Sequence, residues 1–181
     1  GFDSALSASN NVLMVPMMYE SNPKNAFKYV SPSFGGFSGG FSYSLDEDTG
    51  VKTNQTDFSL TYAAGPIAAN FAYEIQGDGA GAPDDIKLTA LNGSYDLGMV
   101  KLLASYGQAK AVDSKATDIQ FGVDVPLSAA LTLSAGYAQS KDNDTAGDGK
   151  RTGYGVAAAY GLSKRTTVYG GFRTSKMKDG S

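Results

Sequence analysis

Apolar and polar residues alternate along much of this chain, and the alternation recurs in separate segments of similar length. The clearest segments are 37–45, 57–64, 67–76, 99–107, 117–125, 130–138 and 152–160. In 67–76, for example, Phe71 and Tyr73 fall on one side, and Asn70 and Glu74 fall on the other. Since successive side chains of a β-strand point to opposite faces, this period of two residues predicts strands with one apolar and one polar face.

Three further segments, 26–31, 86–95 and 166–174, show a weaker alternation and are also expected to be strands. In 86–95 the apolar phase slips between Leu88 and Leu91, which predicts a β-bulge or a misassigned segment. Together with the clearer segments, these give a chain of about ten strands.

The connections between these strands fall into two lengths. Short turns are expected at 32–34, 65–66, 96–98, 126–129 and 161–165, and longer polar loops at 46–56, 77–85, 108–116 and 139–151. Tight turns at one end of the strands and long loops at the other are typical of a transmembrane antiparallel β-barrel. Such strands need only about 9–11 residues each, whereas a spanning helix needs about 20 apolar residues, a length that no apolar run here approaches.

The composition of the two faces indicates the medium that each one meets. The polar face carries mainly Ser, Thr, Gly, Asp, Asn and Lys. The apolar face carries tyrosines, mostly near strand ends, at Tyr43, Tyr62, Tyr73, Tyr106, Tyr137, Tyr154 and Tyr160. A tyrosine suits a membrane interface because its ring is apolar and its hydroxyl is polar. A half-exposed antiparallel sheet in a soluble protein would alternate in the same way and remains the alternative.

The overall composition removes several classes of function. The chain has 181 residues, no Cys and no His, so disulfides, thiolate nucleophiles, a Ser-His-Asp triad and a His-ligated metal are all excluded. Its net charge is −3, and no basic stretch is interleaved with aromatic residues, so nucleic acid is not an expected partner. The sequence therefore predicts neither an enzyme nor a cofactor.

Three stretches resemble the general porins of Gram-negative bacteria, especially those of β-proteobacteria. They are NAFKYVSPSFGGF at 25–37, SYDLGMVKLLASYGQ at 94–108 and AAYGLSKRTTVYGGF at 158–172. The first resembles a strand, a turn and a second strand of that family, and the last resembles a hairpin with a Leu-Ser-Lys-Arg-Thr turn between two tyrosines. With the strand rhythm between them, the resemblance covers nearly the whole chain.

The resemblance implies that only part of a barrel is present. Porins of this family form closed barrels of about 16 strands. By that pattern, residues 1–25 correspond to the end of an inward-folded constriction loop, 26–174 to strands six to fifteen, and 175–181 to the start of an extracellular loop. The first five strands and the closing strand would be missing, so the chain is expected to be a piece of a larger barrel and not a smaller closed one.

The function implied by the resemblance is passive diffusion through a water-filled channel. Such a porin would lie in the bacterial outer membrane as a homotrimer, contact outer-membrane lipid and lipopolysaccharide, and pass small hydrophilic solutes and ions. One rival is a non-channel barrel that acts as an adhesin or structural surface protein, although the small Gly and Ser residues of the polar face leave room for water. An outer-membrane enzyme is disfavoured, because it would need a histidine base.

Charged side chains around the narrowest part of a pore set its selectivity. The candidates are Asp3 and Glu20 on the loop, Lys24 and Lys28 on the wall, and Asp57, Glu74, Lys101, Asp118 and Asp124 elsewhere in the lumen. Lys28 lies opposite in phase to Phe27 and Tyr29, which predicts that it points into the lumen. The alternative for every candidate is a solvated charge that tunes nothing.

A calcium site is a weaker hypothesis. Residues 142–153 begin like a calcium-binding loop, with Asp142, Asp144 and Asp148 as candidate ligands. Ala146 and Gly153 stand where the loop pattern requires acidic ligands, so no metal is expected there.

Overall fold

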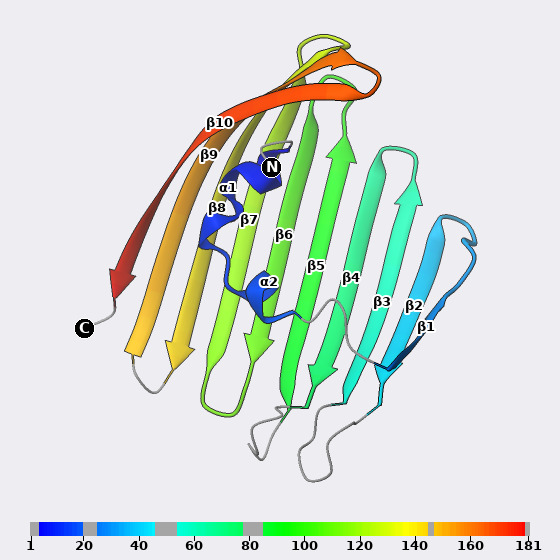
Figure 1. The fold of residues 1–181 in the computed structure, drawn as a ribbon, viewed down its shortest axis with the longest axis vertical. Coiled ribbons are helices and arrows are strands. Elements are labelled where there is room, and N and C mark those ends of the chain that lie inside the picture. Colours follow the sequence, from blue (N-terminus) through cyan, green and yellow to red (C-terminus); the bar gives the residue numbers. More distant parts are fainter. Residues whose placement is uncertain (1–3, 20–24, 46–53, 78–84, 145–146, 180–181) are drawn as a thin grey trace.

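The described residues form one antiparallel sheet and a short helical segment that lies against it (Figure 1). The computed structural model describes residues 4–19, 25–45, 54–77, 85–144 and 147–179. The strands are β1 (Ala26–Val30), β2 (Phe37–Ser44), β3 (Gln55–Ala64), β4 (Ile67–Gln76), β5 (Ile86–Asp96), β6 (Lys101–Lys110), β7 (Lys115–Pro126), β8 (Leu131–Asp144), β9 (Gly147–Ser163) and β10 (Thr166–Asp179). The helices are α1 (Ala5–Ser9), the 3₁₀ turn η1 (Asn10–Val12) and α2 (Val15–Met18).

The strands follow one another in space in the order of the sequence. The sheet has ten strands in the order β1 to β10, so every strand pairs with its neighbours in the chain, and β1 and β10 form the two edges. The number of strands expected from the alternation is therefore confirmed. No helix among the described residues combines the length and the hydropathy needed to cross a membrane.

Three of the expected loops are wrong, because strands continue through them. The loop expected at 108–116 is reduced to 111–114, since β6 runs to Lys110 and β7 begins at Lys115. β8 runs to Asp144 and β9 begins at Gly147, so most of the loop expected at 139–151 is a paired hairpin with Lys141 opposite Lys150. β10 likewise continues to Asp179 instead of ending at 174. These parts of the strands carry polar residues on both faces, so the alternation that marks a strand in the sequence disappears although the backbone pairing continues.

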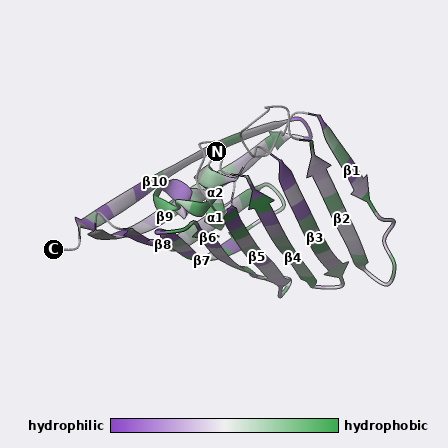
Figure 2. Ribbon diagram, turned by 90° about the horizontal axis from the view of Figure 1, so that it is seen from below, coloured by the Kyte–Doolittle hydropathy of each residue, from purple (hydrophilic) through white to green (hydrophobic). Residues whose placement is uncertain are grey.

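The sheet curls, and its concave side holds α1 and α2 (Figure 2). The convex face carries exposed large apolar side chains, including Phe27, Phe58, Phe121, Val156 and Phe172. Small and polar residues occupy the concave face, where Gln120, Ser134 and Ser140 are buried although they are polar. The two faces predicted by the alternation are thus present, and the polar one is the inner one.

The slip in the apolar phase of β5 has a different cause from the expected β-bulge. β5 pairs with β4 and β6 in an unbroken register from Lys87 to Tyr95, so the expectation of a bulge is wrong. Leu88 lies on the concave face and is 3% exposed, in a cluster with Val15 of α2, Ala109 and Ala116. Leu91 lies on the convex face and is 51% exposed. Leu88 departs from the polar pattern because α2 covers it.

This packing predicts the effect of shortening Leu88. Leu88→Ala is expected to lower the free energy of unfolding by roughly 2–3 kcal/mol, because it opens a cavity beneath α2. Leu88→Met keeps the volume and should cost less than about 1.5 kcal/mol. Denaturant unfolding of the two variants measures the difference, and equal losses would show that Leu88 does not pack against the helix.

Candidate functional site

The candidate site is the concave face of the sheet, which the described part of the N-terminal region crosses. Residues 4–19, called the inner segment below, place α1 over β7 to β10, η1 over β8 and β9, and α2 over β6 and β7 (Figure 1). At the end of α2 the segment reaches β4, where Gln76 Nε2 donates a hydrogen bond to the carbonyl oxygen of Met18 at 3.0 Å. The segment therefore runs across most of the width of the sheet.

Glycines in the wall let α1 lie directly on the strands. A Cβ atom built on Gly136 or Gly155 would overlap the carbonyl oxygen of Ala5 or Ala8, respectively. Both alanines are 0% exposed. The wall and the helix thus meet backbone to backbone, an approach that only glycine permits at these positions.

The inner segment needs these wall contacts because its helices are short. α1 has five residues and α2 has four, whereas isolated helices shorter than about 12 residues are marginal in water. Ser4 caps α1 by accepting a hydrogen bond from the Ser7 amide, and the Ser7 hydroxyl accepts one from the Ser4 amide. The cap stabilises the N-terminal end of α1, and contacts with the wall stabilise the remainder of the helix.

Two carboxylates of β7 hold the inner segment by its backbone. Asp124 Oδ1 accepts hydrogen bonds from the Ala5 amide at 2.8 Å and from the Ser134 hydroxyl at 2.6 Å. Asp118 Oδ2 accepts bonds from the amides of Met14 and Val15 at 2.9 and 2.8 Å. Bonds to a charged acceptor are about twice as strong as neutral ones. Both residues were predicted for the polar face of a pore wall; they lie on the concave face, where they anchor the segment.

Gln120 of β7 is an anchor that the sequence reasoning missed. Its Nε2 donates to the carbonyl oxygen of Leu6 and, at 2.8 Å, to the hydroxyl of Ser9. Gln120 lies between Asp118 and Asp124 on the same face of β7, so three alternate polar positions act on one segment. Nothing in the strand pattern distinguishes these side chains from other polar residues of the inner face.

An acidic corner lies beyond the far end of the inner segment. Lys28, Ser42, Asp57 and Glu74 occupy one row across β1 to β4. Asp57 accepts hydrogen bonds from the Ser42 hydroxyl and, at 3.1 Å, from Gln55 Nε2, while Gln76 Nε2 donates to Glu74 Oε1. The structure thus brings three of the predicted charges, Lys28, Asp57 and Glu74, onto one part of the inner wall.

The acidic corner affects the pKa of Tyr19, the residue that follows α2. Burial raises the pKa of its phenol, and the negative charges of Asp57 and Glu74 raise the same pKa further. Both effects disfavour the phenolate, so Tyr19 stays a neutral hydroxyl beside the acidic pair.

The opposite part of the inner wall carries two arginines. Arg151 of β9 lies opposite Ser140, which in turn lies opposite Asp118, so the three residues form one row on the concave face. Arg173 of β10 lies opposite Gly155 on the same face. Lys101 lies opposite Asp124 near the short turns. The sequence reasoning missed both arginines, because Arg151 fell in an expected loop and Arg173 at the end of a weak strand.

The remaining candidates are placed less fully. Asp3, Glu20 and Lys24 lie outside the described residues. Asp142 is half-buried in β8 opposite Gly149, and the side chains of Asp144 and Asp148 are outside the described set. Within the described part of the chain, no group of three acidic or other ligating side chains is placed to hold a metal.

Three comparisons relate this arrangement to known proteins. Residues 2–180 match the family model for Gram-negative porins. Outer membrane porin protein 32 of Delftia acidovorans is 30% identical over 169 residues, which cover 87% of this chain and 47% of that protein. An outer membrane porin protein of Bordetella pertussis is 25% identical, with 80% and 50% covered. The chain thus spans about half the length of these relatives.

A solved structure shares the fold at low sequence identity. OmpT of Vibrio cholerae, in its trimer form, superposes with a TM-score of 0.68 at 13% identity, over 94% of this chain and 65% of that one. The ten-stranded sheet therefore has the architecture of part of a barrel of this kind.

The anchoring by Asp118 can be tested through the amides it binds. Asp118→Asn is expected to speed hydrogen exchange at Met14 and Val15 by about tenfold or more, because a bond to a charged acceptor contributes roughly 1.5–3 kcal/mol. Asp142→Asn, on the neighbouring strand β8, removes a charge from the same concave face and serves as the control. Hydrogen exchange at Met14 and Val15 is expected to stay unchanged in this variant. Unaltered exchange in Asp118→Asn would show that the carboxylate does not hold the segment.

Proposed function

Because the chain belongs to the Gram-negative porin family, we propose that the protein forms a water-filled channel in the bacterial outer membrane for small hydrophilic solutes and ions. The observation that carries this proposal is the inner segment bound across a polar concave face, while the convex face of the same strands is apolar. Family membership favours a channel over an enzyme. The proposal assigns no catalytic role to any residue.

The ten described strands are too few to enclose a complete channel of this kind. The edge strands β1 and β10 do not pair with each other in the described sheet. In lipid, each unpaired backbone group costs several kcal/mol, so membrane strands close into barrels. Since the two relatives are about twice as long as the matched part, we propose that the rest of the protein supplies the strands that close a barrel of about 16.

The inner segment would narrow the channel and give it an electric field across its width. Asp57 and Glu74 lie on the β3 and β4 side, and Arg151 and Arg173 lie on the β9 and β10 side. Opposite charges on facing walls orient dipoles and ions, and this favours polar over apolar solutes. The backbone anchors at Asp118 and Asp124 would keep the segment at a fixed height.

Membership of the family also indicates which molecules would contact the outside of the barrel. The solved OmpT is described in a trimer form, and we propose a homotrimer with one channel in each subunit. The convex face would contact neighbouring subunits and outer-membrane lipid, including lipopolysaccharide.

Conductance of the full-length protein in a planar lipid bilayer tests the channel itself. Stepwise current increases in a simple salt are expected as single proteins insert. Insertion without conductance, shown by heat-modifiable migration and protection from protease, would instead favour a filled barrel with a structural or adhesive role.

Exchanging single wall charges tests the transverse field. Asp57→Asn is expected to shift the cation-to-anion permeability ratio toward anions, and Arg151→Gln toward cations. Each shift should be about two- to fivefold, because a unit charge close to an ion contributes up to about 1 kcal/mol in water. Reversal potentials in a salt gradient measure the ratio. Lys164→Gln, in the turn before β10, is the control, and shifts of the same sign in Asp57→Asn and Arg151→Gln would contradict the assignment.

A further inference from the structure

A cavity of about 340 Å³ lies between the inner segment and the strands β4 to β7. Leu13, Val15, Pro16 and Tyr19 line it from the side of the inner segment. Cavities that bind small molecules have volumes of roughly 300–1,000 Å³, so this one has room for one small solute.

A row of uncharged polar side chains follows one edge of the cavity. Thr61, Asn70, Asn92 and Ser105 lie directly opposite one another across β3 to β6, and the last three line the cavity. Asn70 Nδ2 donates a hydrogen bond to Thr61 Oγ1 at 3.0 Å, which orients the Asn70 carboxamide. Within the described part of the chain, the side chains of Asn92 and Ser105 make no hydrogen bond to another residue, so both are available to a ligand.

The next row of the wall is small and apolar. Ala72, Ala90 and Gly107 lie directly opposite one another across β4, β5 and β6, two positions along each strand from the polar row. These side chains are short, so this part of the wall is flat. Val15 of α2 lies over its edge, since a Cβ atom built on Gly107 would be 3.2 Å from Val15 Cβ. The cavity thus has a flat apolar wall with a line of hydrogen-bonding groups beside it.

The charge at the cavity is already bound to the protein. Asp118 is the one charged residue among the described residues that line the cavity. It is 4% exposed, and its Oδ2 accepts hydrogen bonds from the amides of Met14 and Val15. An ionised ligand would therefore lose hydration here without gaining an accessible partner of opposite charge, which is costly. The cavity favours a neutral ligand.

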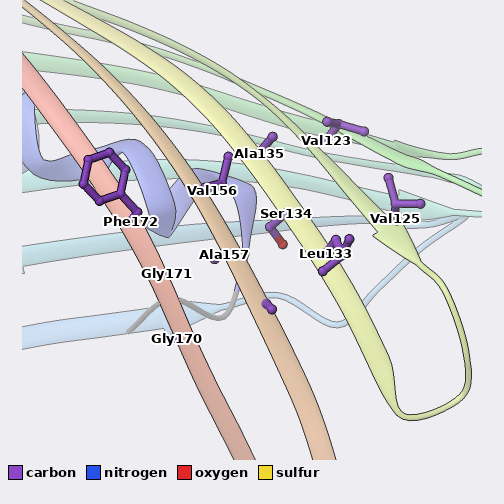
Figure 3. Close-up of a pocket in the computed structure, with 11 residues that line it drawn as sticks. Val123, Val125, Leu133, Ser134, Ala135, Val156, Ala157, Gly170, Gly171 and Phe172 are labelled. Atoms are coloured by element: carbon purple, nitrogen blue, oxygen red, sulfur yellow. The ribbon is translucent and has the colours of Figure 1, made fainter.

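The grooves of the convex face have a different character. The groove shown in Figure 3 has a volume of about 450 Å³ and is lined by apolar side chains such as Leu133, Val156 and Phe172. It offers few hydrogen-bonding groups to a hydrophilic solute. The cavity beside α2 combines apolar and polar groups, as the binding sites of small polar molecules do.

We propose that this cavity binds a pyranose ring of a neutral sugar as the sugar passes through the channel. The C–H groups on the face of the ring fit the flat wall of Ala72, Ala90 and Gly107, and the hydroxyls at its rim bind Asn92 and Ser105. A carboxamide presents a donor beside an acceptor, and neighbouring ring hydroxyls can each donate and accept. The inference rests on the proposed function and deepens it, because it names a class of solute and the residues that recognise it.

The test measures ion current through the full-length protein in a planar lipid bilayer as D-glucose is added. Glucose bound in the channel obstructs ions, so the current is expected to fall to a plateau. Asn92→Ala/Ser105→Ala should raise the half-saturating glucose concentration by roughly 20-fold, since each hydrogen bond between uncharged groups contributes about fivefold. Ala90→Leu should abolish the plateau with the polar row intact, because its side chain fills the space over the flat wall.

The matched control is Asn11→Ala/Ser94→Ala. It removes one Asn from η1 and one Ser from the concave face of β5, both outside the cavity, and should leave the half-saturating concentration unchanged. Glycerol at equal viscosity should lower the current without a plateau.

The remaining outcomes overturn the inference in distinguishable ways. Equal inhibition by sorbitol, an open-chain polyol, would show that the ring is not recognised. Stronger inhibition by D-glucuronate, which adds a carboxylate to the ring, would show that wall charges select the solute. A conducting channel without a glucose plateau, or with the same plateau in Asn92→Ala/Ser105→Ala, rejects only this inference. A lack of conductance rejects the proposed function as well.

Discussion

The hydrogen bonds between the carboxylates of β7 and the backbone of the inner segment determine what the concave face can do. The segment contains helices too short to be stable alone, and it lies on a wall whose glycines provide contact but no directional bonds. Asp118 and Asp124 supply the directional hydrogen bonds that the glycines lack. Asp124 accepts a bond from the amide of Ala5, and Asp118 accepts bonds from the amides of Met14 and Val15. A wall of larger side chains would push the segment away, and a wall without carboxylates would leave its amides without acceptors.

The sequence predicted the strands of the sheet, but it could not predict which backbone amides Asp118 and Asp124 bind. A strand is visible in the sequence because its alternation is local, and all ten strands were found that way. The amides bound by Asp118 and Asp124 lie 103 to 119 residues away along the chain. An aspartate on the polar face of a strand looks the same whether it meets water or a backbone amide. Its position was therefore predictable and its partner was not.

The errors in the strand assignment have one physical origin. Alternation reports the difference between two media, and it fails where that difference is absent or reversed. At Leu88 the concave face is apolar because α2 covers it, so a regular strand appeared irregular. At the β8 and β9 hairpin, both faces are polar, so a paired strand appeared to be a loop and Arg151 was overlooked. In each case the backbone pairing was normal and only the surroundings had changed.

The charges of the sheet follow the same division between two media. Carboxylates on the concave face have partners within the protein, as Asp57, Asp118 and Asp124 show. Lysines on the convex face are paired in register with other lysines, as in Lys110 with Lys115 and Lys141 with Lys150. A soluble sheet would gain from mixing the two signs on its exposed face, because cross-strand pairs of opposite charge stabilise it. Arg151, Arg173 and Lys101 share the concave face with the carboxylates, so both signs occur where the inner segment binds. On the convex face of β5 to β10, every described charged side chain is positive, and no opposite charge of the sheet lies beside it.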